Sequence, residues 1–472
     1  MNFVSGENIY KMKYLVLICV YYCVNFTSGF GMKYRNFPYI TGDNVGEPLF
    51  LTPFIENGSI AEGQSAASVK PVKANVKSYA GFFTVNKQYN SNMFFWYFPA
   101  ENNSTTAPVV LWLQGGPGAS SLYGLFNENG PFYVKKERGL KSRKYYWSQI
   151  LNVIYIDNPV GTGFSFTDND NGYVKNEDGV GNDLYSALTQ FFKLFPELRK
   201  NDFFVAGESY AGKYVPAIAY KIHTSNEQNL PKINLKGISI GNGLSDPENM
   251  LNYGDYLYQI GLIDSSTRMA FQRKQDDIVK NIQAKNYLKA FEGFDALLNG
   301  DLTPYKSFFY NQTGFSFYFN YLHNEDDSPY GDMGEYVQKD VMRRSIHVGN
   351  LTFHTDSKVE QYLKQDVMQS VKPWIEKLVE KYKVLFYNGQ LDIIVPYPLT
   401  INFLQRLKWS GANIYKTVPR KKWMVGNELA GYSKTVKGFT EVLVRNAGHM
   451  VPGDQPKWAL DLITRFVYNK PF

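Results

Sequence analysis

The chain has 472 residues, a formal net charge of +7, and a globular composition with 44% hydrophobic and 20% charged residues. This length allows one large α/β domain with an insertion, or several average domains. Basic residues are scattered along the chain, with only short clusters such as Lys135-Lys136. Nucleic-acid binding usually requires a basic stripe or patch, so we expect no nucleic-acid partner.

Residues 1–29 are predicted to be a signal peptide. Basic residues precede a short apolar run at 15–24, and the small residues Ser28 and Gly29 follow at a suitable cleavage point. The run is too short to span a bilayer comfortably, so no membrane span is expected after signal removal. Translation from Met12 would leave an ordinary signal peptide, and a retained signal anchor is the alternative.

The sequence after residue 29 contains no cysteine but several N-glycosylation motifs. The only two cysteines lie within the predicted signal peptide, so no disulfide is expected in the mature chain. Acceptor motifs begin at Asn57, Asn102, Asn103, Asn311 and Asn350. The chain is therefore predicted to be a glycoprotein of the secretory pathway.

Residues 30–75 are rich in Pro, Gly and Asn and are predicted to form an extended arm. Beyond them, short apolar runs are each followed by a glycine-containing turn and a helical stretch. These runs lie at 109–113, 153–156, 203–206, 237–240, 384–387 and 441–444. Near-continuous apolar strands that alternate with helices predict a mostly parallel sheet buried on both faces.

Residues 246–365 break this rhythm, because they are helical and polar in places and aromatic around 308–321. We interpret this stretch as a helical cap inserted over the sheet. The core would then consist of residues 76–245 and 366–472. A separate domain with its own role is the alternative.

Ser209 has the local sequence of a nucleophile. The segment 203–212 reads FFVAGESYAG, in which a predicted strand ends, small residues flank a serine, and a helix begins. This pattern is typical of the nucleophile elbow of the α/β-hydrolase fold, which lifts the serine hydroxyl clear of the backbone. We therefore predict that fold, with Ser209 as the nucleophile.

A serine hydroxyl needs a base, and the base needs an acid to orient it. In this fold the chain order is Ser, acid, His. Among the five histidines, only His449 lies on a glycine-containing turn directly after a predicted core strand. Asp392 follows the strand at 384–387 and precedes His449, whereas Glu428 and Glu441 lack that placement. Ser209, Asp392 and His449 are the predicted catalytic triad.

The oxyanion of such a reaction needs backbone N–H donors. The glycine-rich loop at 115–118 follows an early strand, and glycine lets main chain approach a substrate closely. Gly116 from this loop and Tyr210, the residue after the nucleophile, are the predicted donors.

Several motifs in order resemble the serine carboxypeptidase family, and most resemble its vitellogenic-like branch, which includes insect venom enzymes. They are WLQGGPGASS at 112–121, NPVGTGFS at 158–165, GESYAGKYVP at 207–216, GNG at 241–243 and GHMVP at 448–452. The resemblance runs from about residue 75 to the C-terminus. It implies a secreted or lysosomal peptidase that works best at acid pH and acts on the C-termini of peptides or proteins.

The resemblance also implies how a free C-terminus is bound. The family positions for the terminal carboxylate correspond to Gln114, Gly115, Glu128 and Glu208. Two close carboxyl groups can share a proton, and the protonated one can donate a hydrogen bond to a substrate carboxylate. The family often has Asn in place of Gln114 and Cys in place of Ala119, so carboxylate binding can be shifted here and a usual disulfide is absent.

The predicted function is a serine-type carboxypeptidase that releases single C-terminal residues through an acyl-enzyme on Ser209. No cofactor is expected, and no metal, since the sequence lacks the paired His and Glu motifs of metallopeptidases. Acyl transfer on the same triad, and a non-catalytic binding or protective role, are the alternatives.

Overall fold

The computed structural model describes residues 44–70, 76–135, 139–228, 232–300, 302, 304–326, 333–355 and 357–472. The predicted signal peptide and its two cysteines lie outside these residues. Within the described ranges, no helix has the length and apolar character needed to cross a membrane.

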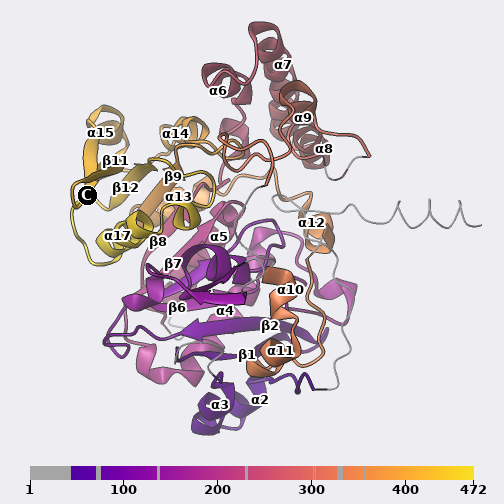
Figure 1. The fold of residues 1–472 in the computed structure, drawn as a ribbon, viewed down its shortest axis with the longest axis vertical. Coiled ribbons are helices and arrows are strands. Elements are labelled where there is room, and N and C mark those ends of the chain that lie inside the picture. The colour runs from indigo at the N-terminus through magenta and orange to yellow at the C-terminus, as the bar shows by residue number, and fades with distance from the viewer. Residues whose placement is uncertain are drawn as a thin grey trace, which may run out of the picture.

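A ten-stranded sheet in the order β1-β2-β6-β3-β7-β8-β9-β12-β11-β10 forms the centre of the molecule (Figure 1). Its strands are β1 (Tyr79–Asn86), β2 (Ser91–Phe98), β3 (Val109–Leu113), β6 (Asn152–Ile156), β7 (Phe203–Glu208), β8 (Leu235–Gly241), β9 (Lys383–Gly389), β10 (Lys421–Val425), β11 (Glu428–Val436) and β12 (Phe439–Val444). The central strands β6, β3, β7, β8, β9 and β12 run parallel. A separate antiparallel pair contains β4 (Phe132–Lys135) and β5 (Gly139–Ser142).

The central strands form because their apolar residues alternate between two buried faces. In β3, Val109 and Leu111 belong to one hydrophobic cluster, and Val110 and Trp112 belong to a second cluster across the sheet. Since successive side chains in a strand point to opposite faces, a continuous apolar run suits a sheet covered on both sides. Each of the six predicted runs lies within one of these parallel strands, which confirms the predicted α/β architecture.

Helices cover both faces of the sheet. They are α2 (Thr52–Glu56), α3 (Ile60–Ala67), α4 (Glu177–Leu194), α5 (Ala211–Glu227), α6 (Tyr253–Gln259), α7 (Ser265–Gln283), α8 (Tyr287–Leu297), α9 (Phe308–Thr313), α10 (Met333–Val337), α11 (Asp340–Ser345), α12 (Ser357–Leu363), α13 (Lys372–Leu378), α14 (Tyr397–Leu404), α15 (Ala412–Thr417), α16 (Val451–Asp454), α17 (Pro456–Val467) and a π-helical turn η1 (Gly124–Asn129). Buried residues of α4, α5, α13 and α14 join one cluster, and those of α10, α11, α16 and α17 join the other.

The prediction of an extended arm over 30–75 is wrong for part of its length. Its described residues include α2 and α3. Pro53 occupies the first turn of α2, where its missing N–H costs nothing. Helix α3 is rich in Ala, a strong helix former, and buries Gly63 and Ala67. The antiparallel edge hairpins β1–β2 and β10–β11 were also not predicted, because no helix follows their first strands.

Between β8 and β9, every regular element among the described residues is a helix. Helices α6 to α9 of this stretch stand at one end of the molecule (Figure 1).

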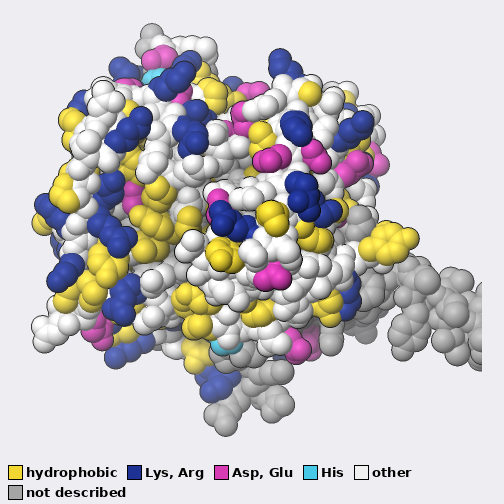
Figure 2. Space-filling model, turned by 90° about the horizontal axis from the view of Figure 1, so that it is seen from above, with side chains coloured by type: hydrophobic (Ala, Val, Ile, Leu, Met, Phe, Trp, Pro, Cys, Tyr) yellow, Lys and Arg dark blue, Asp and Glu magenta, His cyan; other side chains and the backbone are white. Residues whose placement is uncertain are grey.

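The face seen in Figure 2 carries Lys and Arg side chains interspersed with acidic and hydrophobic ones. The division into a core and a cap at residues 246–365 stays a prediction.

Candidate active site

Ser209 lies on the turn between β7 and α5. Its φ of +64° is in the left-handed region, which a non-glycine residue adopts only when its surroundings hold it there. The Ser209 N–H donates to the Gly241 carbonyl at 3.0 Å, and the Ser209 carbonyl accepts from the Leu244 N–H at 3.1 Å. A Cβ on Gly207 would lie 2.7 Å from the Ala211 Cβ, so the turn needs small residues. The backbone is that of a nucleophile elbow.

Asp392 follows β9 and is fully buried, yet its carboxylate is well satisfied. Its Oδ2 accepts from the His449 Nδ1 at 2.8 Å and from the Asn242 amide at 2.7 Å. The backbone N–H groups of Ile394 and Val395 donate to the same carboxylate at 2.9 and 3.2 Å. These donors all stabilise negative charge, so Asp392 can orient the imidazole.

His449 follows β12 and lies under residues of the stretch between β8 and β9. Its N–H donates to the Phe319 carbonyl at 2.7 Å, and the two rings lie 5.2 Å apart. The second ring nitrogen, Nε2, is buried and makes no hydrogen bond with any described residue. Asp392 thus binds the histidine that the sequence pattern selected.

Residues at the end of β8 contact both the nucleophile turn and the acid. Gly241 binds the Ser209 N–H, and the next residue, Asn242, binds Asp392. Because His449 Nε2 has no hydrogen bond within the described residues, the Ser209 hydroxyl does not bind it in this structure. Catalytic hydrogen bonds are often long before substrate binds. The complete triad therefore stays a prediction.

The predicted oxyanion loop packs against the nucleophile turn. A Cβ on Gly115 would lie 2.5 Å from the Tyr210 nitrogen and 2.7 Å from the Ser209 Cβ, so only glycine fits there. Gly116 has a φ of +112°, which also favours glycine. The loop thus lies beside Tyr210, the residue that carries the other predicted donor. The donor roles themselves stay predictions.

Two buried glutamates, Glu128 on η1 and Glu208 at the end of β7, lie close enough for each to shift the pKa of the other. The Gln114 amide donates to the Glu208 Oε1 at 3.1 Å, and the Trp112 indole N–H donates to the Gln114 Oε1 at 3.1 Å. Trp112 therefore fixes which end of the amide faces Glu208. The other Glu208 oxygen and both Glu128 oxygens find no donor among the described residues.

Burial raises the pKa of both glutamates. The pKa of Glu128 rises from 4.5 to about 7, because desolvation outweighs the opposing effects of the neighbouring Glu208 and Gln114 side chains. The pKa of Glu208 rises well above 4.5, first by desolvation and then by the negative charge of Glu128. Two such groups cannot both ionise cheaply, so the pair keeps a proton at acid pH.

Three residues near the site had no predicted role. Asn242 binds Asp392, and the only sequence signal for it was its place in a Gly-Asn-Gly turn after a strand. Phe319 covers the His449 ring, and nothing local in its sequence marks that contact. Asp157 is buried with its pKa raised to about 7 by desolvation, and it accepts from the Ser120 hydroxyl at 2.5 Å.

All five asparagines of the predicted glycosylation motifs are exposed to solvent. Exposure leaves room for a glycan in the folded protein, and their modification stays a prediction.

The chain matches the serine carboxypeptidase family, Peptidase S10, over residues 69–469. Venom serine carboxypeptidase of Apis mellifera is 58% identical to it over 468 residues, which cover 98% of this chain and 100% of that protein. Vitellogenic carboxypeptidase of Aedes aegypti is 49% identical over 429 residues, which cover 90% of each protein.

The crystal structure of a prohormone-processing carboxypeptidase from Saccharomyces cerevisiae is similar in fold. Its TM-score is 0.71 at 23% identity, and the match covers 86% of this chain and 96% of that chain. This likeness confirms the predicted α/β-hydrolase fold. The family match and the curated relatives confirm the predicted peptidase class, and the chain belongs to the serine carboxypeptidase family.

Proposed function

We propose that this carboxypeptidase releases single C-terminal residues through an acyl-enzyme on Ser209, with His449 as base and Asp392 as its orienting acid. The observation that carries the proposal is the 2.8 Å contact between His449 Nδ1 and Asp392 Oδ2. That contact fixes the imidazole, and it leaves Nε2, which has no partner among the described residues, to take the serine proton.

The chemistry follows from these positions. As the Ser209 Oγ attacks the scissile carbonyl, His449 Nε2 takes its proton and then gives it to the amine of the departing residue. Water next attacks the acyl-enzyme with the same histidine as base, and Ser209 regains its proton. Asp392 stabilises the imidazolium in both steps. The N–H groups of Gly116 and Tyr210 are the proposed oxyanion donors, each contributing about 10²- to 10³-fold in rate.

Exopeptidase specificity is assigned to Gln114, Gly115, Glu128 and Glu208, which we propose bind the substrate's terminal carboxylate. An anionic ligand needs donors, and a glutamate donates only when it is protonated. Burial raises the pKa of Glu128 to about 7, so the pair holds a proton at acid pH. Above neutral pH Glu128 ionises, so the pair becomes anionic and repels the terminal carboxylate. We therefore propose an acid pH optimum.

The proposed setting is the secretory pathway, ending in secretion or in the lysosome. The exposed asparagines of the glycosylation motifs and the apolar run at 15–24 support it. An acidic compartment would also keep the Glu128–Glu208 pair protonated.

The test uses purified enzyme, a blocked dipeptide with a free C-terminus, and its C-terminally amidated twin, between pH 4 and 8. We expect release from the free peptide to be fastest at acid pH. Ser209→Ala should lower kcat by about 10⁴- to 10⁶-fold without changing the circular dichroism spectrum. A fluorophosphonate should label the wild type and not Ser209→Ala.

Three outcomes would contradict the proposal. Ser209→Ala could keep wild-type activity, the fluorophosphonate could label both proteins, or the enzyme could be fastest above neutral pH. An acyl-glucose donor with an alcohol acceptor tests the transferase alternative, which would be favoured by acyl transfer without peptide hydrolysis.

A further inference from the structure

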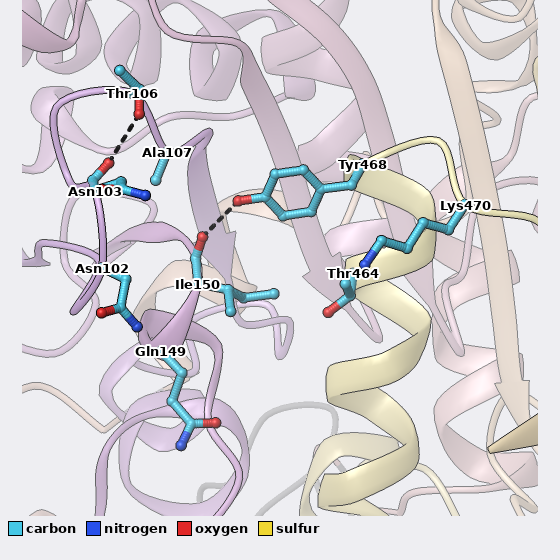
Figure 3. A pocket seen from close by; sticks show the side chains of 9 residues that line it. All are labelled: Asn102, Asn103, Thr106, Ala107, Gln149, Ile150, Thr464, Tyr468 and Lys470. Atoms are coloured by element: carbon cyan, nitrogen blue, oxygen red, sulfur yellow. Dashed lines mark hydrogen bonds between the residues drawn. The ribbon is translucent and has the colours of Figure 1, made fainter. Parts of the chain in front are cut away.

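Figure 3 shows the residues that line a cavity of about 390 Å³. The cavity lies at the end of the sheet where the central strands begin, away from the candidate active site. It is lined from the residues just before β3 and β6 and from the end of α17. Because β3, β6 and β7 run parallel, the starts of these strands lie at the far edge from Ser209. The cavity therefore plays no part in the proposed chemistry.

Two lining residues, Asn102 and Asn103, are the acceptors of overlapping N-glycosylation motifs. Their loop is held in place. The Asn103 carbonyl accepts from the Ala107 N–H at 2.8 Å, and the buried Asn152 amide donates to the carbonyls of Ser104 at 2.7 Å and Ala107 at 2.8 Å. A group attached to this loop would thus have a fixed position at the cavity.

The opposite wall carries an aromatic side chain. The Tyr468 hydroxyl donates to the Ile150 carbonyl at 2.9 Å, which holds the ring across the cavity (Figure 3). The ring is 42% exposed, so one part of it is available for contact. An aromatic ring with a few polar groups beside it, in a volume of about 300–1,000 Å³, is typical of small-ligand sites.

We propose that one N-linked glycan is attached at the Asn102–Asn103 pair and that its first N-acetylglucosamine occupies this cavity against the Tyr468 ring. Bulky sugars on adjacent residues would collide, so the pair accepts a single glycan. In the attachment step the asparagine amide nitrogen bonds to the anomeric carbon of a lipid-pyrophosphate-linked oligosaccharide. The amide loses a proton, and the lipid pyrophosphate leaves.

This inference rests on the proposed secretory setting, since the glycan donor is found there. A tethered sugar has a high effective concentration at the cavity, so even a weak contact is occupied. The contact exists only in the folded chain and therefore stabilises it. The stabilisation should depend on both partners, the first sugar and the Tyr468 ring.

The experiment uses the full chain expressed through a eukaryotic secretory pathway. Peptide mass spectrometry first identifies the occupied asparagines. The melting temperature is then compared for three forms: intact, trimmed to the first N-acetylglucosamine by an endoglycosidase, and fully deglycosylated by an amidase. The first two should melt together, and the third should melt about 1–2 °C lower.

Variants assign this difference to the cavity. In Tyr468→Ala the difference between trimmed and fully deglycosylated forms should vanish, and in Tyr468→Phe it should persist. Asn102→Gln/Asn103→Gln measures the contribution of glycans at the other motifs. Asn311→Gln is the matched control, because it removes an exposed motif that does not line the cavity, and it should keep the difference.

The proposal is overturned if the Asn102–Asn103 peptide carries no sugar in a protein glycosylated elsewhere. It is also overturned if the three forms melt together, or if the loss is the same in Tyr468→Ala. A protein without sugar at any motif would overturn the secretory setting as well. Carboxypeptidase kcat/KM should be unchanged in every form, so failure here leaves the proposed catalytic chemistry standing.

Discussion

Two buried carboxylate sites near the nucleophile differ in how their oxygens are satisfied. Asp392 accepts hydrogen bonds from the Asn242 amide, the His449 imidazole and two backbone N–H groups. The Glu128–Glu208 pair accepts one, from a side-chain amide, and its other oxygens find no donor within the described ranges. Both sites are fully buried, so burial alone does not distinguish them.

The difference shows that the supply of donors decides what a buried carboxyl group does. A carboxylate with several donors stays charged, and it can hold an imidazolium. Carboxyl groups without donors hold a proton instead, and can offer it to a ligand. The fold thus gives Asp392 several donors, whereas Glu128 and Glu208 share a single one.

The largest expected effect is that of Asp392→Asn on kcat. The amide keeps the shape of the carboxylate, but it can face Nδ1 of His449 with an N–H, which selects the wrong tautomer. We expect kcat for the blocked dipeptide to fall by about 10⁴-fold with folding preserved. Retention of a tenth or more of wild-type kcat would show that Asp392 is not the orienting acid.

A buried ion pair that includes a residue of α5 tests how much a paired buried carboxylate contributes to stability. The Lys213 ammonium lies 2.7 Å from the Asp366 Oδ2, and both side chains are buried. Lys213→Met removes the only cation of this pair and leaves a buried carboxylate unpaired, so we expect a loss of about 3–5 kcal/mol in the free energy of unfolding.

Urea denaturation measures this loss. The matched control is Lys358→Met, which breaks the exposed Lys358–Asp170 pair, 2.6 Å long, and should leave the midpoint unchanged. Equal midpoints for Lys213→Met and Lys358→Met would refute the assigned role of the buried pair.

Glu208→Gln should alter substrate choice more than turnover chemistry. The amide can donate a hydrogen bond, but it lacks the stronger one that a carboxyl proton gives to a carboxylate. We expect kcat/KM to fall by about 10- to 100-fold for the peptide with a free C-terminus, with little change for the amidated peptide.

A matched control for this variant is Glu441→Gln. Glu441 is also buried, but it accepts from the hydroxyls of Tyr397 and Tyr415 and does not contact the pair. The ratio of the two substrates should stay at the wild-type value there. A parallel fall for both peptides in Glu208→Gln would count against a role in binding the terminal carboxylate.

The central sheet could be predicted because its signal is local. Each parallel strand is a short apolar run before a turn, so composition along the chain marks it. The edge hairpins were not predicted, because antiparallel edge strands need no helix after them. Helices α2 and α3 were not predicted, because a stretch that contains Pro and Gly can still start a helix, as it does at Pro53.

The candidate site divides in the same way. Ser209, Asp392 and His449 each follow a strand, so their positions could be predicted from order and turn context. Two other contacts join segments that are distant in the sequence, so no local pattern predicts them. Phe319 packs on the His449 ring, and the Asn242 amide donates to Asp392. The role of Glu128 came from family resemblance, since a glutamate in a polar segment carries no local sign of burial.

The smallest expected effect concerns the response of stability to pH. The pKa of Glu128 is about 7 in the folded chain and 4.5 in the absence of burial. The folded state therefore binds a proton more tightly than the unfolded state between these values. Stability from this group is fully present below pH 4.5, falls as pH rises to 7, and is constant above.

Glu128→Gln removes this titration while keeping the size of the side chain. We expect the melting temperature of the wild type to drop more than that of Glu128→Gln between pH 5 and 7.5, by about 2 °C. The comparison cancels raised-pKa carboxyl groups outside the pair, such as Asp157, because both proteins contain them. Equal drops would mean that Glu128 is ionised in the folded chain throughout, and the contrast with Asp392 would then disappear.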